Sequence, residues 1–232
     1  MVRIFLAISL FISTLFAGES ALEAFKKQEY TKAFNLYMKD AKSGDSVAQN
    51  ALSYLYFNGI GIDKDTKEGL FWLKKSAHSM DAVAQYDLGM MYLTGSNVKQ
   101  DSKLALTWLD SSADLGNANA QYNVALMHYR GDATDINVTR AAELLEKAAL
   151  QGHEGAQKNI GTIYMQLIRF DDAAKWLEME AKKGNSEAYY LLSEIYCEQE
   201  KFIKAKKWAK LSMESGNENA TLLWHKYNLE KY

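Results

Sequence analysis

Two short stretches of this 232-residue chain contain side chains of the kinds that bind ligands or do chemistry. The stretch Asn58–Asp65, NGIGIDKD, places two glycines one residue apart ahead of two aspartates, as in loops that hold a phosphate or a calcium ion. The stretch Ser96–Lys99, SNVK, has the Ser-x-x-Lys spacing of serine β-lactamases, which attack an acyl group with the serine. The two stretches would therefore predict ligand binding and acyl transfer, respectively.

The remaining reactive side chains are scattered along the chain. The four histidines form no HExxH pattern, so we expect no metal site and no cofactor. His128 stands where other units carry a tyrosine, which favours a packing role. The single cysteine, Cys197, has no disulfide partner within the chain. We expect it to pack as a small apolar side chain at a helix end, and an intermolecular disulfide is the alternative.

The chain repeats itself, and the repeat shows how these stretches are used. Units of 36 residues begin at Ala41, Ala77 and Ala113, and units of 32 residues begin at Ala149 and Ala181. Three columns of side chains recur. One column is the alanines Ala48, Ala84, Ala120, Ala156, Ala188 and Ala220. The second is Tyr56, Tyr92, His128, Tyr164 and Tyr196, and the third is Trp72, Trp108, Leu144, Trp176 and Trp208.

Aligned in this way, Asn58–Asp65 is predicted to be a turn between two helices. Its second glycine, Gly61, becomes Asn97 and Ala133 in the next two units, which a phosphate loop would not allow. We therefore expect Gly61→Ala to be tolerated. The predicted N-caps of the helices after these turns are Asp65, Asp101 and Asn137. Ser96–Lys99 falls in the same variable turn without SDN and KTG companions, which favours a solvated turn over an active site.

The pattern predicts an all-α fold. The chain has no proline, which suits uninterrupted helices, and each unit contains two amphipathic segments. Such antiparallel helix pairs bury their apolar faces only by stacking, which gives a right-handed superhelix, or solenoid. The predicted parts are a signal peptide (1–17), an incomplete repeat (18–40), three 36-residue repeats (41–148), two 32-residue repeats (149–212) and a C-terminal capping helix (213–232).

The first residues are typical of a secretory signal peptide. Arg3 precedes an apolar run from Ile4 to Phe16, which is too short to span a bilayer, and small residues follow at Ala17 and Gly18. We expect cleavage near Ala17, a periplasmic or secreted protein, and no stable membrane anchor after cleavage. A buried first helix is the alternative.

The residues 82–121, AVAQYDLGMMYLTGSNVKQDSKLALTWLDSSADLGNANAQ, resemble a Sel1-like repeat, a relative of the tetratricopeptide repeat. The two shorter units resemble tetratricopeptide repeats more closely. The resemblance implies a nonenzymatic adaptor, and exported bacterial members act in envelope assembly, host interaction or immunity against secreted toxins. A cysteine-rich branch is described as penicillin-binding and β-lactamase-like, which gives the alternative function. That branch has a disulfide in each repeat, whereas this chain has one cysteine.

A protein or peptide partner is expected on the concave face of the superhelix. Nucleic acid is not expected, because the formal net charge is -2 and no basic face is evident. The predicted partner-binding residues are Tyr54, Phe57, Tyr86, Asp87, Tyr122, Asn123, Tyr129 and Tyr190. The pairs Tyr86–Asp87 and Tyr122–Asn123, in the same register 36 residues apart, are the predicted centre. Alternatively, these tyrosines pack between neighbouring repeats.

Overall fold

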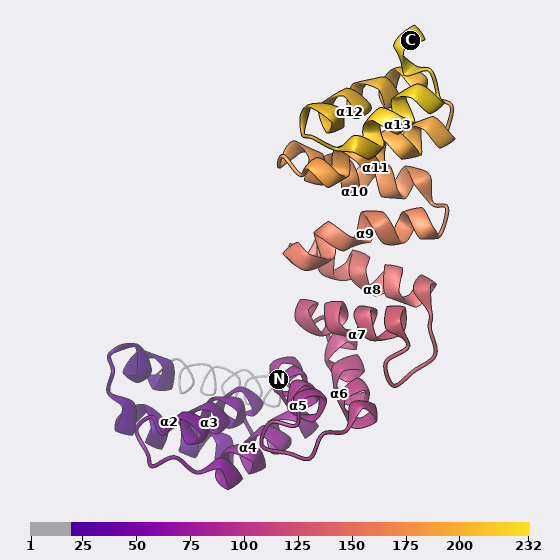
Figure 1. Cartoon of the computed structure of the whole chain (residues 1–232). Helices are drawn as coiled ribbons and strands as arrows, with labels where there is room; N and C mark the ends of the chain where they lie inside the picture. Colours follow the sequence, from indigo (N-terminus) through magenta and orange to yellow (C-terminus); the bar gives the residue numbers. More distant parts are fainter. Residues whose placement is uncertain (1–19) are drawn as a thin grey trace, which may run out of the picture. The chain divides into compact units, whose positions relative to one another are not determined.

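A computed structural model describes residues 20–232 (Figure 1). The predicted signal peptide, residues 1–17, therefore lies outside the described residues. Residues 20–26 are helical. The helices that follow are α2 (Tyr30–Lys42), α3 (Ser46–Asn58), α4 (Thr66–His78), α5 (Ala82–Thr94), α6 (Ser102–Asp114), α7 (Ala118–Arg130), α8 (Val138–Leu150), α9 (Glu154–Gln166), α10 (Phe170–Lys182), α11 (Ser186–Glu198), α12 (Phe202–Glu214), α13 (Glu218–Lys226) and the 3₁₀ helix η1 (Leu229–Lys231). Residues 20–232 contain no strand, so the all-α prediction is confirmed.

The chain forms two compact units, Met1–Ala120 and Gln121–Tyr232. In the first unit α2 packs on α3, α3 on α4, α4 on α5 and α5 on α6. In the second unit the same succession runs from α8 to α12, and α13 packs on α12. Each unit is thus a stack of helices that follow one another in chain order, as Figure 1 shows.

Side-chain caps explain where many of the helices begin, although α2, α10 and α12 have none. Asp45 and Asp81 accept hydrogen bonds from the backbone N–H groups of Ala48 and Ala84, at 3.0 and 2.8 Å. The predicted caps of the second helices behave alike. Asp65 accepts from Lys67 and Glu68, Asp101 from Lys103 and Leu104, and Asn137 from Arg140. These side chains satisfy N–H groups that the first helical turn leaves unpaired, which confirms the predicted turns.

The prediction that Gly61 can be exchanged freely is wrong. Gly61 has a φ of +72°, and a Cβ there would collide with the carbonyl oxygen of Tyr30 and lie 2.9 Å from the backbone nitrogen of Thr31. The aligned residues Asn97 and Ala133 also have positive φ values, 60° and 61°, so conformation alone does not require glycine. The close approach of the turn to the start of α2 requires it, and the alignment of units cannot show that contact.

The alanine column lies in the core. Its six members are at most 2% exposed. Serines of the second helices hold the first helices in register, because Ser76 Oγ donates to the Ser46 carbonyl at 2.8 Å and Ser112 Oγ donates to the Ala82 carbonyl at 2.6 Å. The two contacts lie 36 residues apart and are equivalent, so α3 and α5 have the same orientation relative to their second helices.

Candidate partner-binding groove

An apolar groove runs between α3 and α5 in the first unit. Two adjoining hollows, of about 320 and 480 Å³, are open to solvent and share three lining residues, Asn50, Tyr54 and Asp87. We define the α3–α5 groove by these three residues together with Val47, Val83 and Met90. Leu22 and Phe25, from the helical segment 20–26, line one of its ends, and Phe57 lines the other.

Helical spacing places the groove residues on one stripe of each helix. Val47, Asn50 and Tyr54 are separated by three and four residues on α3, and Val83, Asp87 and Met90 by four and three on α5. Val47 and Val83 each precede a buried alanine of the column, so they point away from the core. Their exposed fractions are 67% and 52%, and that of Tyr54 is 55%. The groove therefore presents apolar surface to solvent.

Among residues 20–232, Asp87 is the only carboxylate or basic group that lines either hollow. Burial among apolar side chains disfavours its charged form and raises the pKa of its carboxyl to about 6, and the charge of Asp81 adds to this rise. Among residues 20–232, no side chain donates a hydrogen bond to this carboxylate or forms an ion pair with it. A half-buried acid without a partner thus lies in the middle of the groove.

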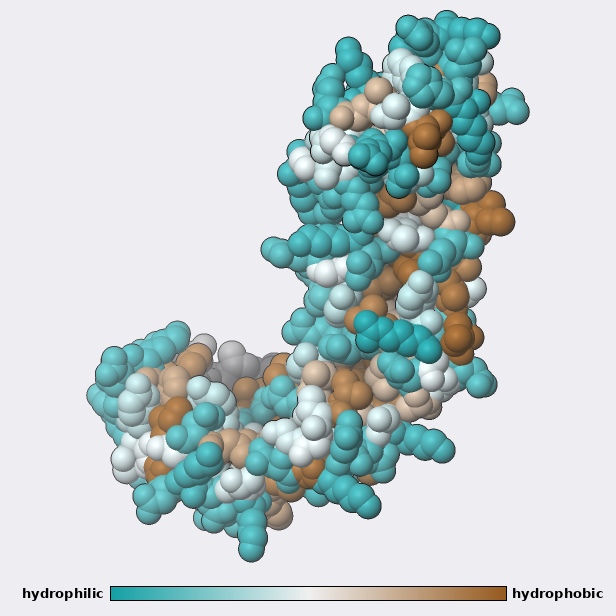
Figure 2. Space-filling view, in the orientation of Figure 1, coloured by the Kyte–Doolittle hydropathy of each residue, from teal (hydrophilic) through white to brown (hydrophobic). Residues whose placement is uncertain are grey.

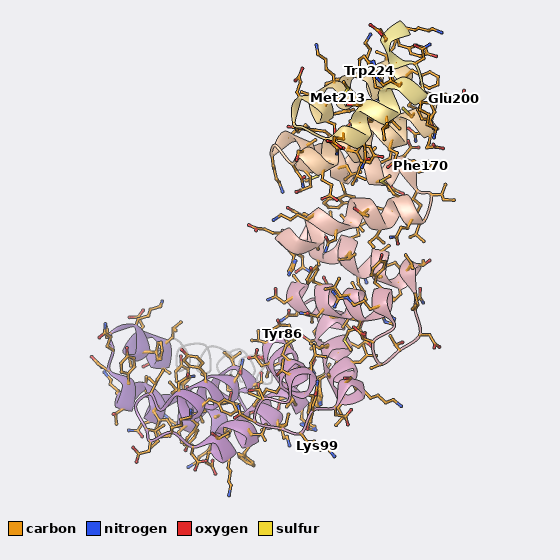
Figure 3. The ribbon with its side chains drawn as sticks, in the orientation of Figure 1. Tyr86, Lys99, Phe170, Glu200, Met213 and Trp224 are labelled. Carbon is orange, nitrogen blue, oxygen red and sulfur yellow. The ribbon has the colours of Figure 1, made fainter. Side chains whose placement is uncertain are left out.

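The structure brings together three of the predicted partner-binding residues, Tyr54, Phe57 and Asp87. Phe57 has a second role, because its ring lies over Gly69 of α4, where a Cβ would come within 2.9 Å of the ring. Tyr86, on the neighbouring side of α5, is half-buried and lines neither hollow (Figure 3).

The predicted residues of the second unit make contacts within the protein. Tyr122 stacks on His153 with ring centres 4.4 Å apart, and its hydroxyl accepts a hydrogen bond from Asn159 Nδ2 at 3.3 Å. Asn123 is half-buried and also has a partner within the chain. The Tyr129 hydroxyl accepts from Gln166 Nε2 at 2.9 Å, and the Tyr190 hydroxyl donates to Glu194 at 3.2 Å. For Tyr122 and Tyr129 these contacts favour the alternative that inner-face tyrosines pack between repeats.

Sequence reasoning missed Val47, Val83 and the role of His153. The two valines stand six residues into their units, where later units have Asn119, Gly155 and Glu187. An apolar residue next to the alanine column was the available signal. His153 caps α9, since its Nδ1 accepts from the Ala156 N–H at 3.1 Å. Its alignment with Asp45 and Asp81 could have shown this role.

Ser96 and Lys99 do not line a common site. Ser96 lines the hollow that contains Tyr54, whereas Lys99 lines a different hollow with Lys74 and Tyr92. Figure 3 shows Lys99 on the turn that follows α5. The Ser96 N–H donates to the Met91 carbonyl at 3.1 Å, which closes the end of α5. The pair therefore lacks the convergence of nucleophile and base that acyl transfer requires.

Other reactive groups are buried or dispersed. Cys197 is a free thiol with 2% exposure, and burial raises its pKa to about 11, so it has the environment of the predicted small apolar side chain. Within residues 20–232, no three His, Cys, Asp or Glu side chains are grouped so that they could hold a metal ion. The same part of the chain has no helix with the length and apolar character needed to cross a bilayer.

Comparison with known proteins identifies the repeats. The family model of the Sel1 repeat matches residues 46–79, 82–117 and 118–153. The matches begin at residues 46, 82 and 118, five residues after Ala41, Ala77 and Ala113, because the family model starts at the first helix of each pair. A search of the curated proteins gave no significant match.

Two solved structures extend the likeness over most of the chain. A Sel1 repeat protein from Oxalobacter formigenes is 27% identical, with a TM-score of 0.65 over 88% of this chain and 84% of that one. A protective antigen with an SLR fold, present in uropathogenic Escherichia coli strains, is 26% identical, with a TM-score of 0.59 over 81% of this chain and 42% of that one. The chain thus contains three Sel1 repeats within residues 46–153, and its all-α fold is similar to that of a solved Sel1 repeat protein.

Proposed function

We propose that the chain is an exported, nonenzymatic adaptor whose α3–α5 groove binds a segment of a partner protein. The observation that carries this proposal is the exposure of Val47, Tyr54 and Val83 along one groove, at 67%, 55% and 52%. Exposed apolar side chains that are grouped in a hollow mark interaction sites in soluble proteins. Tyrosine is also enriched among the residues that dominate interface energies.

A protein segment suits this groove better than a small substrate. Both hollows are open to solvent, whereas pockets for small molecules enclose most of the ligand. Asp87 is the one acidic or basic group that residues 20–232 contribute to the lining, so this part of the chain places no pair of groups for acid–base chemistry in the groove. These features favour binding without turnover.

Site-specific photocrosslinking in the cells that make the protein tests this proposal. A photoreactive phenylalanine derivative replaces Tyr54 in the groove, and Ile203, a 76% exposed residue of α12, serves as the matched control position. We expect a discrete crosslinked protein from position 54 and none from position 203. Equal crosslinking from both positions, or none from position 54, would refute the groove as the binding site.

The same method compares the groove with the centre predicted from the sequence. A crosslinker at Tyr86 lies on α5 next to Asp87 but outside both hollows. If the partner binds in the groove, position 54 should crosslink more efficiently than position 86. The identity of the crosslinked protein then decides between an envelope protein, a host protein and a secreted toxin.

Export is a separate part of the proposal. The arrangement of Arg3, the apolar run and Ala17 supports a signal peptide that is removed. Mass spectrometry of the protein from an envelope extract should give a mature chain that begins near Gly18. A chain that retains Met1 and stays in the cytoplasmic fraction would refute export without affecting the groove.

A further inference from the structure

We infer that the segment bound by the α3–α5 groove is apolar and carries one lysine or arginine, whose charge pairs with Asp87. This inference rests on the proposed function and adds the chemistry of the partner. It concerns the part of the groove where the two hollows meet, between Tyr54 of α3 and Asp87 of α5.

The position of Asp87 is central to the groove. Its neighbours on the same stripe of α5 are Val83 and Met90, and Asn50 and Tyr54 line the same hollows from α3. A segment that covers the exposed side chains of Val47, Tyr54 and Val83 therefore also covers the carboxylate. Apolar side chains of the segment would meet the valines and the tyrosine, and one of its side chains must face Asp87.

The charge in the groove has no complement within the described chain. No lysine, arginine or histidine from residues 20–232 lines either hollow. Asp81, the N-cap residue of α5, is the charged group that acts on Asp87, and it adds negative charge. A segment that covered Asp87 with a neutral side chain would leave a buried charge unpaired, and an acidic side chain would add repulsion. A lysine or arginine satisfies the site.

The repeat itself does not require an acid here. The residues that align with Asp87 in the other units are Ala51, Asn123, Asn159 and Leu191, none of which is charged. The alanine column and the N-caps, which serve packing and capping from unit to unit, do recur. Asp87 thus departs from the repeat at one position, inside the groove, at a cost in desolvation.

Selection from a random library of 12-residue peptides displayed on phage tests the inference. The targets are the wild-type chain, Asp87→Asn, Asp87→Lys, the double variant Tyr54→Ala/Val83→Ser, and Asp63→Asn. The last is a matched control, because it removes the same charge from an exposed turn outside the groove. Circular dichroism and thermal unfolding establish that each variant is folded, and calorimetry measures the affinity of the enriched peptides.

We expect the wild type and Asp63→Asn to enrich apolar peptides with one lysine or arginine. Asp87→Asn should weaken their binding about 10-fold or more, the scale of a lost hydrogen bond to a charged group. Asp87→Lys should instead enrich acidic peptides.

Two other results have distinct meanings. Peptides that need Tyr54 and Val83 but show no excess of basic residues, or bind Asp87→Asn unchanged, would overturn the inference and leave the proposed function standing. If no enriched peptide loses affinity in the Tyr54→Ala/Val83→Ser variant, the groove is not a peptide site, and both proposals are wrong.

Discussion

The α3–α5 groove and the inner helix face of the second unit are built on the same repeat positions but use them differently. In the groove, Val83 stands six residues into its unit with 52% exposure, and Tyr54 is 55% exposed. In the second unit one of the residues at the place of Val83 is Gly155. A Cβ on Gly155 would lie 3.0 Å from Tyr122 Cζ, so the absence of a side chain lets the tyrosine ring pack there.

Repeat register therefore does not decide whether an aromatic residue is available to bind a partner. Tyr122 has a stacking partner in His153 and a hydrogen-bond donor in Asn159, so its ring and its hydroxyl are both satisfied internally. The Tyr54 hydroxyl has no hydrogen bond among residues 20–232, and much of its ring is in solvent. The groove keeps its apolar surface available, whereas Tyr122 contributes to cohesion between repeats.

Truncation of these two tyrosines should change the free energy of unfolding by very different amounts. Tyr122→Ala should lower the free energy of unfolding by about 2 kcal/mol, because the stacked ring and its packing are lost. Tyr54→Ala should change stability by less than about 0.5 kcal/mol, as is usual for exposed residues. Urea unfolding of the whole chain, followed by circular dichroism, measures both. A greater loss from Tyr54→Ala would show that Tyr54, too, is a packing residue.

A second prediction exchanges the side chains at the shared repeat position. Gly155→Val places the valine of the groove under Tyr122 and should cost about 1–3 kcal/mol, the range for overpacking. Val83→Thr keeps the β-branched shape at an exposed place, so stability should stay within about 0.5 kcal/mol. The binding of a groove peptide, in contrast, should weaken only in Val83→Thr. Equal stability losses in the two variants would remove the distinction between the faces.

The sequence predicted the fold well because the fold depends on local, repeated signals. The N-caps at Asp45 and Asp81 and the buried alanine column recur at fixed spacing, and each reports a contact that every unit makes. The prediction that Gly61→Ala is tolerated is wrong for the opposite reason. The constraint on this glycine comes from the carbonyl of Tyr30, a contact that α2 makes with this turn alone.

The candidate site was only partly predictable for a related reason. Helical periodicity predicts that Tyr54, Phe57 and Asp87 belong to one surface, and all three line the groove. Periodicity cannot show that Tyr122 is covered, since that depends on Gly155 and His153 in the next repeat. Nor can it show that Asp87 has no cationic partner among residues 20–232, because the absence of a partner is a property of the assembled surface.

A smaller change is expected in how the free energy of unfolding of the chain depends on pH. The pKa of Asp87 is raised from 3.8 to about 6 in the folded chain, so the folded state holds this proton more tightly than the unfolded state. Above pH 6 the carboxylate is ionised in both states and its burial destabilises the fold. As the pH falls from 6 towards 3.8, protonation of the folded state removes this penalty.

Asp87→Asn should therefore stabilise the chain by about 1 kcal/mol at pH 7.5, a value reduced from the full shift because the carboxyl is partly open to solvent. Most of this gain should be lost by pH 4.0, where the folded state holds the proton and the unfolded state begins to bind it. The matched case in the second unit is Glu180, a buried carboxylate whose Oε1 lies 2.7 Å from Lys183 Nζ. Glu180→Gln should lower stability at pH 7.5, because it removes a paired charge.

Urea unfolding at pH 7.5 and 4.0 measures the free energy of unfolding of both variants, with Asp63→Asn as the control for charge removal alone. A loss of stability in Asp87→Asn at pH 7.5 would mean that the carboxylate has a structural partner, and its assignment to partner binding would then have no support.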